Sequence, residues 1–280
     1  MSAGLDIEVA DFRRLADILA SEGIEGIDIL GGEPTLHPDL IPIIDAACTK
    51  GLAISMSTNG SNVQMLKTLS QNYDQSRLRI GVSLNGKPID ESLLFYIGES
   101  RPLLKSVCTH RQFLPDNTER FLDMPDIRYY AIFMDTLRNT DLARSLPFAQ
   151  FHKTLNSLRR RHKNLEGVYC SGFIPDIGNY PILESVRCPA GTTKLSIMPD
   201  GSVYPCYLLF QREEFRLGNI LSDRLKDIEN NPLLNFFKTF KKNECLNVHC
   251  DLFSRCHGGC PAVSLAVHGD LNAPDPRCVS

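Results

Sequence analysis

The placement of the cysteines constrains this chain more than any other feature of its sequence. Ten cysteines occur in 280 residues, and seven of them follow residue 185. Those seven are Cys188, Cys206, Cys245, Cys250, Cys256, Cys260 and Cys278. The region that holds them is irregular and too small for a large apolar core, so it needs a staple such as disulfides or bound metal.

Three kinds of staple compete for these cysteines. Disulfides are disfavoured, because the first dozen residues show no secretory signal and reducing compartments keep thiols reduced. Zinc sites favour short Cys or His pairs, and no Cys-x2-Cys pair occurs here. Iron–sulfur clusters also take four thiolates and tolerate scattered ligands. The spacing therefore favours iron–sulfur clusters and weakens the zinc interpretation.

Charge and hydropathy exclude other classes of protein. The net charge is −3, which argues against a general binder of nucleic acid or of anionic membranes. No apolar run approaches the roughly 18 residues of a membrane-spanning helix. We therefore expect a cytoplasmic protein that binds neither nucleic acid nor membrane.

Strands alternate with helices through the first 165 residues. Apolar runs predict strands that begin near residues 26, 52, 78, 103 and 127, and amphipathic patterns predict helices over 7–23, 40–50, 62–72 and 147–163. This order is typical of an α/β fold with a parallel sheet, either open or part of a barrel. Polar residues such as Glu33, Thr58 and Ser83 gather at the strand ends, where such sheets bind ligands.

The alternation stops after residue 165. We predict a barrel domain over residues 1–165, a connector over 166–187 and a small cysteine-rich domain over 188–280. Residues 194–198 and 202–204 flank a Pro-Asp-Gly turn and predict a β-hairpin.

The late cysteines follow a recognisable order: Cys188-x12-Gly201-x4-Cys206, then Cys245-x4-Cys250-x5-Cys256-x3-Cys260, then Cys278. This order resembles the SPASM domain, the auxiliary iron–sulfur module of radical S-adenosylmethionine (SAM) enzymes. That family has Cys-x2-Cys where this chain has Cys245-x4-Cys250, with Asn247 at the position of the first cysteine. The resemblance implies that Cys245 takes that ligand role through a longer loop, and His249 is a weaker substitute.

The first half of the chain also resembles radical SAM proteins. Gly31-Gly32-Glu33-Pro34 after a strand, Thr58-Asn59-Gly60 after the next and Val82-Ser83-Leu84-Asn85-Gly86 after the one beyond match that family in order. The resemblance implies a partial (β/α)6 TIM-like barrel in which Gly31, Gly32 and Glu33 hold the SAM amino group. Glycines let a ligand approach the backbone, and a carboxylate pairs with an ammonium group. Ser83 and Asn85 become candidates for binding the SAM ribose and carboxylate.

The resemblance also implies two auxiliary [4Fe–4S] clusters. Cys245, Cys250, Cys256 and Cys278 would hold one. Cys188, Cys206 and Cys260 would share the other, which leaves one iron open to substrate, water or an outside ligand.

One family motif does not occur in the sequence. The radical-generating [4Fe–4S] cluster of this family is held by Cys-x3-Cys-x2-Cys after the first strand, and this chain contains no such motif. Cys48, Cys108 and Cys170 are too scattered to replace it and are interpreted as ordinary buried or surface thiols. Met1 lies in the loop that follows the motif in the family. We therefore interpret the chain as a fragment or mis-started copy of a longer enzyme, to which that cluster would belong.

Several functions stay open at this point. The resemblance implies hydrogen abstraction by a 5′-deoxyadenosyl radical during modification of a peptide or protein, with a reducing partner such as a ferredoxin or flavodoxin. It assigns no catalytic residue. The sulfatase-maturating branch has an Asp where Tyr207 stands here, which disfavours formylglycine chemistry. The alternatives are a degenerate, non-catalytic partner protein that binds iron–sulfur clusters and SAM, or a zinc-stabilised α/β scaffold.

Overall fold

The computed structural model describes residues 6–86, 88–116, 118–124, 126–170, 172–186, 188–210, 212–239, 245 and 249–278. The chain divides into two compact units. Unit 1 consists of Met1–Val107, Leu114–Ala131 and Leu158–Glu166, and unit 2 of Cys108–Phe113, Ile132–Ser157 and Gly167–Ser280. The predicted domain boundaries near residues 165 and 188 rest on a change in sequence character, and they stay a prediction.

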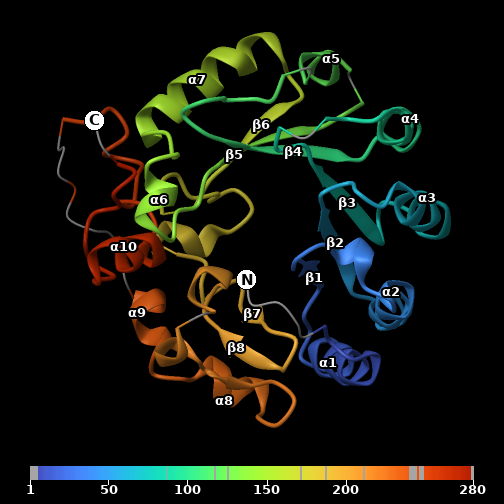
Figure 1. Cartoon of the computed structure of the whole chain (residues 1–280). Coiled ribbons are helices and arrows are strands. Elements are labelled where there is room, and N and C mark those ends of the chain that lie inside the picture. The colour runs from blue at the N-terminus through green and yellow to red at the C-terminus, as the bar shows by residue number, and fades with distance from the viewer. Residues whose placement is uncertain are drawn as a thin grey trace. The chain divides into compact units, whose positions relative to one another are not determined.

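A six-stranded sheet runs through the first part of the chain in the order β1-β2-β3-β4-β5-β6 (Figure 1). Its strands are β1 (Gly26–Ile29), β2 (Ala53–Thr58), β3 (Leu78–Ser83), β4 (Leu103–Cys108), β5 (Tyr129–Phe133) and β6 (Leu165–Val168). Strands β1 to β4 pair in parallel. The predicted α/β fold is therefore confirmed. Within the described residues the sheet is open, with β1 and β6 at its edges.

Alternation along the strands gives the sheet one apolar and one polar face. On β2, Ile54 and Met56 are 2% exposed, whereas Ser55 and Ser57 point to the opposite face and are only half-buried. The polar face carries Asp28, Ser55, Ser57, Ser83 and Lys105. It is aligned by the register that pairs Asp28 with Ser55 and Ser83 with Lys105.

Helices cover the apolar face in unit 1. These are α1 (Val9–Ser21), α2 (Leu40–Thr49), α3 (Val63–Asn72) and α4 (Glu91–Ser100), which lie outside the strands in Figure 1. Three agree with the predicted helices. Helix α4 is not among them, although Asp90 caps it by accepting a hydrogen bond from the Leu93 amide at 2.8 Å. The short α5 (Glu119–Leu122) follows later in the unit.

Helix α7 (Phe148–Arg161), which the sequence also predicts, begins in unit 2, and its last turn belongs to unit 1. The other elements of unit 2 are short. The predicted hairpin forms from β7 (Ser196–Ile197) and β8 (Ser202–Tyr204), and β9 (Gly218–Asn219) adds a third antiparallel strand. The remaining helices are α6 (Asn139–Leu142), α8 (Leu225–Glu229), α9 (Leu234–Thr239) and α10 (Pro261–His268).

An aromatic cluster forms much of the core of unit 2. Phe148 stacks on Phe173 with ring centroids 4.0 Å apart, and Phe133 meets Phe173 edge to face at 5.4 Å. Phe151 lies 5.0 Å from Phe133. This cluster fixes the end of β5 against α7 and against the segment that follows β6.

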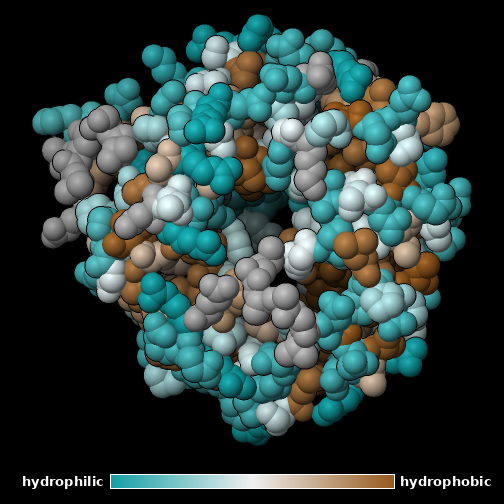
Figure 2. Space-filling model, viewed as in Figure 1, coloured by the Kyte–Doolittle hydropathy of each residue, from teal (hydrophilic) through white to brown (hydrophobic). Residues whose placement is uncertain are grey.

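The surface shows no large apolar belt on the side drawn in Figure 2, where apolar residues lie in separate areas among hydrophilic ones. Among the helices of the described chain, none combines the length and the hydropathy that crossing a bilayer requires.

Candidate functional site

The turn after β1 is built around the Glu33 carboxylate. Its Oε1 accepts hydrogen bonds from the Thr35 amide at 3.1 Å, the Thr35 hydroxyl at 2.6 Å and the Thr58 hydroxyl at 2.7 Å. Its Oε2 accepts one from the Asn59 amide at 2.6 Å. Asn62 adds a bond from its side-chain amide to the Thr35 carbonyl at 2.9 Å. The turn after β1 and the turn after β2 are thus held together by one carboxylate.

These donors keep Glu33 ionised. Burial alone would raise the pKa of the carboxyl, but the hydrogen bonds from Thr35, Asn59 and Thr58 outweigh burial and hold this pKa below its ordinary value of 4.5. A carboxylate has about four acceptor positions, two on each oxygen. Three donors reach Oε1 and one reaches Oε2, so Oε2 keeps capacity for a ligand.

The two glycines before Glu33 leave open space. A Cβ added to Gly31 or Gly32 would have no described atom within 4 Å. Neither glycine has a positive φ. Neither packing nor backbone conformation within the described chain therefore explains why these two residues are glycines. Space for a ligand that approaches the backbone closely does explain it.

Ser83 and Asn85 lie at the end of β3, as the sequence predicts. The Asn85 side-chain oxygen accepts a hydrogen bond from the Val107 amide at 2.9 Å and so braces the end of β4. Their role toward SAM stays a prediction.

Lys105 is a residue of the polar face that sequence reasoning missed. The Lys105 side chain passes over Gly81 of β3, and its ammonium group donates a hydrogen bond to the Ser57 hydroxyl on β2. A Cβ at position 81 would lie 3.3 Å from the Lys105 Nζ, so glycine leaves room for this side chain. Burial lowers the pKa of Lys105, and the nearby Asp28 carboxylate opposes that shift. The available signal was a lysine in the middle of a predicted strand whose other residues, apart from Ser106, are apolar.

In unit 2 the seven predicted cysteines fall into two groups. The first thiol group, Cys188, Cys206 and Cys260, is buried, with each residue 4–8% exposed. Burial raises the pKa of Cys188 and of Cys206 to about 12, and the nearby Cys260 adds to both shifts. The three thiols are thus close enough to act on one another electrostatically.

The second thiol group consists of Cys245, Cys250, Cys256 and Cys278. Burial raises the pKa of Cys256, and Cys245 and Cys250 contribute to the shift. Burial raises the pKa of Cys278 to about 12, with contributions from the three other thiols of the group. The two groups coincide with the two ligand sets that the family resemblance implies. That these cysteines bind metal stays a prediction.

Backbone amides point at the sulfurs in a repeated pattern. The Gly258 amide donates to Cys256 Sγ at 3.3 Å, and the Leu252 amide donates to Cys250 Sγ at 3.4 Å. The amides two residues after Cys188 and after Cys206 donate in the same way. Such donors favour the thiolate, the form that binds metal.

No three His, Cys, Asp or Glu side chains in the described ranges converge tightly enough to surround one metal ion. A [4Fe–4S] cluster asks for a different arrangement, because each of its four thiolates binds a different iron.

A buried ion pair lies beside the first thiol group. The side chains of Arg277 and Asp275 are both fully buried. Arg277 donates from Nε and Nη2 to the two Asp275 oxygens at 3.0 and 2.8 Å, and from Nη1 to the Met134 carbonyl at 2.9 Å. Its guanidinium also lies 4.8 Å from the ring centroid of Phe133. Sequence reasoning missed both charged residues.

The same pair shapes the Cys-His-Gly-Gly-Cys segment. Asp275 Oδ2 accepts a hydrogen bond from the Cys260 amide at 2.7 Å. Gly259 has φ +90°, and a Cβ there would lie 2.2 Å from the Asp275 Cβ. Glycine is therefore required at 259 for Asp275 to reach the backbone of Cys260.

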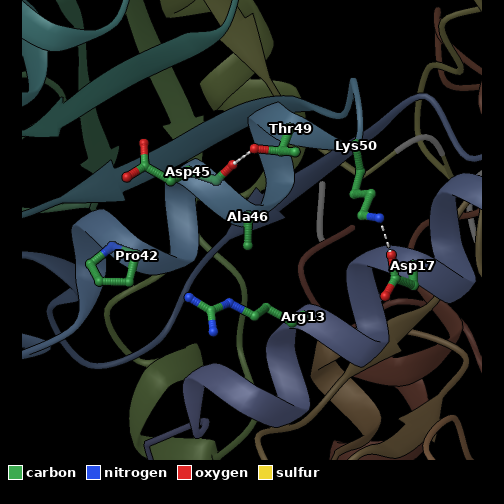
Figure 3. A pocket seen from close by; sticks show the side chains of 7 residues that line it. All are labelled: Arg13, Asp17, Pro42, Asp45, Ala46, Thr49 and Lys50. Atoms are coloured by element: carbon green, nitrogen blue, oxygen red, sulfur yellow. Dashed lines mark hydrogen bonds and ion pairs between the residues drawn. The ribbon is translucent and has the colours of Figure 1, made fainter.

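Figure 3 shows a pocket of about 450 Å³ between α1 and α2. Within it Lys50 pairs with Asp17, and the Thr49 hydroxyl donates to the Asp45 carbonyl at 2.7 Å. Its lining, Arg13, Asp17, Pro42, Asp45, Ala46, Thr49 and Lys50, contains none of the predicted site residues.

Comparison with known families agrees with this geometry. Residues 3–86 match the radical SAM superfamily, and residues 188–261 match SPASM, described as an iron–sulfur cluster-binding domain. The two matches define a radical SAM domain followed by a SPASM domain. The chain belongs to the radical SAM superfamily and contains a SPASM domain.

Three similar proteins illustrate the family. The subtilosin biosynthesis protein AlbA of Bacillus subtilis is 24% identical, over 91% of this chain and 60% of its own length. The PqqA peptide cyclase of Ruegeria pomeroyi is 23% identical, over 98% of this chain and 79% of its own. The crystal structure of Streptococcus suis SuiB bound to S-adenosylmethionine superposes with a TM-score of 0.67 at 18% identity, over 100% of this chain and 71% of that one. This chain thus spans 60–79% of the lengths of these proteins.

The Glu33 network predicts a pH-dependent contribution to stability. We expect Glu33→Gln to lower the free energy of unfolding by about 1–3 kcal/mol at pH 7, because an amide group would face the Asn59 donor. A lowered carboxyl pKa stabilises the fold above the ordinary value of 4.5, and this contribution is lost as pH falls below it. Urea denaturation of both proteins should therefore show a difference that shrinks below pH 4.5.

The control for this measurement is Glu166→Gln, which affects a partly exposed pair with Arg128. We expect a change below about 1 kcal/mol there. Equal losses for the two variants, or a loss at Glu33 that does not depend on pH, would contradict the prediction.

The buried ion pair predicts a larger effect. We expect Arg277→Met to lower the free energy of unfolding by about 3–5 kcal/mol, because it leaves the Asp275 carboxylate buried without its cation. The exposed pair Arg224–Asp227 provides the control, and Arg224→Met should leave the urea midpoint close to that of the unmodified protein. Urea denaturation followed by circular dichroism measures both, and similar midpoints would refute the assignment.

Proposed function

We propose that this chain binds two [4Fe–4S] clusters through its cysteines and SAM at the Glu33 turn, and that it acts in the modification of a peptide. The observation that carries the proposal is the gathering of seven cysteines, spread over 91 positions from Cys188 to Cys278, into two groups with amide donors directed at their sulfurs. The family matches support cluster and SAM binding.

The residues of unit 2 fit a cluster. The sulfurs are held within each group, and four of them accept amide hydrogen bonds of the kind that tunes iron–sulfur sites. Lys194 acts electrostatically on both Cys188 and Cys206 and favours their thiolate forms. The bound cluster would supply one-electron chemistry or a binding position for substrate.

The residues of unit 1 fit SAM. Glu33 offers an ionised, positioned carboxylate to an ammonium group, and Gly31 and Gly32 leave space beside it. Ser83 and Asn85 at the end of β3 would contact the ribose or the carboxylate. SAM bound to a reduced cluster supplies radical hydrogen abstraction in this family.

The proposed substrate class is a peptide. Relatives named above act in subtilosin biosynthesis and in PqqA peptide cyclisation, and SuiB has a structure bound to the precursor peptide SuiA. An electron donor such as a ferredoxin or flavodoxin would complete the system. Catalytic residues are not assigned.

Metal analysis tests the cluster part. After anaerobic reconstitution, we expect about eight irons and eight sulfides per chain, the content of two [4Fe–4S] clusters. Cys250→Ala should lose about four irons, because it removes one of the four thiols of the second group. Cys48→Ala, in helix α2 of unit 1, is the control and should keep all of them. Zinc without sulfide would instead support a zinc-stabilised scaffold.

We expect this chain to bind SAM without cleaving it. The 280-residue chain has no Cys-x3-Cys-x2-Cys motif, so we expect it to bind SAM but to release no 5′-deoxyadenosine with dithionite. Glu33→Gln should weaken binding by about 10–100-fold, the worth of a charge-assisted hydrogen bond.

Calorimetric titration measures the affinity, and chromatography of the reaction mixture measures the cleavage. Glu166→Gln should bind SAM as the unmodified chain does. Unchanged affinity in a folded Glu33→Gln protein would refute the assigned role of Glu33. Release of 5′-deoxyadenosine would show that other thiols can hold the radical-generating cluster.

A further inference from the structure

The two thiol groups differ in size. The second has four members, which is the number that a [4Fe–4S] cluster binds, whereas the first has three. The family pattern supplies no further cysteine for the first group. Its fourth ligand must therefore come from outside that pattern, or one iron stays open.

The segment after β6 runs beside the first thiol group. The Gly259 amide donates to the Gly172 carbonyl at 2.8 Å, and the His257 amide donates to the Phe173 carbonyl at 3.3 Å. Cys170 starts the turn that leads into this contact, because its carbonyl accepts the Phe173 amide at 2.9 Å. These backbone bonds place Cys170 next to Cys260.

The side chains meet as the backbone suggests. The Cys170 thiol lies near enough to the Cys260 thiol to act on it electrostatically, and Cys260 is 4% exposed. Cys170 is half-buried. Because Cys260 also acts electrostatically on Cys188 and Cys206, its proximity to Cys170 brings a fourth sulfur to the group.

The position of Cys170 is fixed by the core of unit 2. Phe173 is fully buried and packs against Phe148 and Phe133 in the aromatic cluster. The guanidinium of Arg277 lies 5.3 Å from the Phe173 ring centroid. The turn that starts at Cys170 is thus anchored on the same buried charge that holds the Cys260 amide through Asp275.

Other ligand candidates are less suitable. Asp135 acts electrostatically on Cys206 and Cys260, but its oxygens already accept from the Tyr207 hydroxyl and from Arg277 at 3.5 Å. A carboxylate is also a harder ligand than the thiolates that iron–sulfur clusters select. Cys108 is fully buried at the end of β4, where it bonds the Ile132 backbone.

We propose that Cys170 is the fourth ligand of the first thiol group, so that Cys188, Cys206, Cys260 and Cys170 hold a [4Fe–4S] cluster with no open iron. This inference rests on the proposed cluster binding. It replaces the expectation of an open iron and the interpretation of Cys170 as an ordinary thiol.

The test uses the reconstituted full chain, its Cys170→Ala variant and the control Cys48→Ala. Cys48 is also a half-buried cysteine, but it lies in unit 1 beside Arg77. We expect about eight irons in the unmodified chain and in Cys48→Ala, and a loss of one to four irons in Cys170→Ala. The electron paramagnetic resonance spectrum of the reduced clusters should change only in Cys170→Ala.

A second measurement does not depend on how the variant folds. Cyanide added to the reduced protein binds an iron that lacks a protein ligand and shifts the spectrum. We expect no shift in the unmodified chain, and a shift in Cys170→Ala if its cluster is retained. A shift in the unmodified chain, or eight irons with an unchanged spectrum in Cys170→Ala, would overturn the inference while leaving cluster binding intact. An unmodified chain that holds no iron would overturn the proposed function, and the inference with it.

Discussion

The buried pair of Arg277 and Asp275 is the interaction on which the cysteine-rich part of the chain depends. Removing two charges from water costs several kcal/mol for each ion, and only good geometry offsets this cost. Here Asp275 accepts from two guanidinium nitrogens and from the amides of Arg277 and Cys260. Burial disfavours the charged guanidinium, yet the Asp275 carboxylate outweighs burial and raises the pKa of Arg277. Asp275 holds the backbone of Cys260, which belongs to the first thiol group. Arg277 directly precedes Cys278, which belongs to the second, so this one ion pair positions a cysteine of each group.

The Glu33 network solves a similar problem in unit 1 with neutral donors. Amides and hydroxyls from two successive turns satisfy the carboxylate without a cation. This difference matters for function. A fully buried ion pair such as Arg277–Asp275 has its charges matched and is suited to hold structure. Glu33 keeps its full negative charge beside open space, and it is therefore suited to receive a positively charged ligand group.

Local sequence patterns predicted those strands and helices whose own residues show a clear apolar run or periodicity. The first five strands and helices α1, α2, α3 and α7 follow apolar runs and periodicities that need no knowledge of the rest of the chain. Helix α4 carried such a signal too, since Leu93, Tyr96 and Ile97 are buried at helical spacing behind the Asp90 cap, and it was overlooked. Strand β6 contains Gly167, and β9 has two residues, so periodicity could not indicate either. Arg277 and Met134 are 143 positions apart, and no local pattern could join them.

The proposed ligand set of the first thiol group bears on what that site can do. A cluster with one iron that lacks a protein ligand can anchor a substrate group at that iron. A cluster whose four irons each bind a cysteine can do so only if one cysteine is displaced. If Cys170 completes the set, direct substrate binding is disfavoured and electron transfer becomes the natural role. The buried guanidinium of Arg277 favours the ionised form of Cys260 from close by, while Asp135 and Asp275 add negative charge nearby. Because charge and hydrogen bonds to sulfur set the potential of such sites, this buried network would tune the electron affinity of a cluster held beside it.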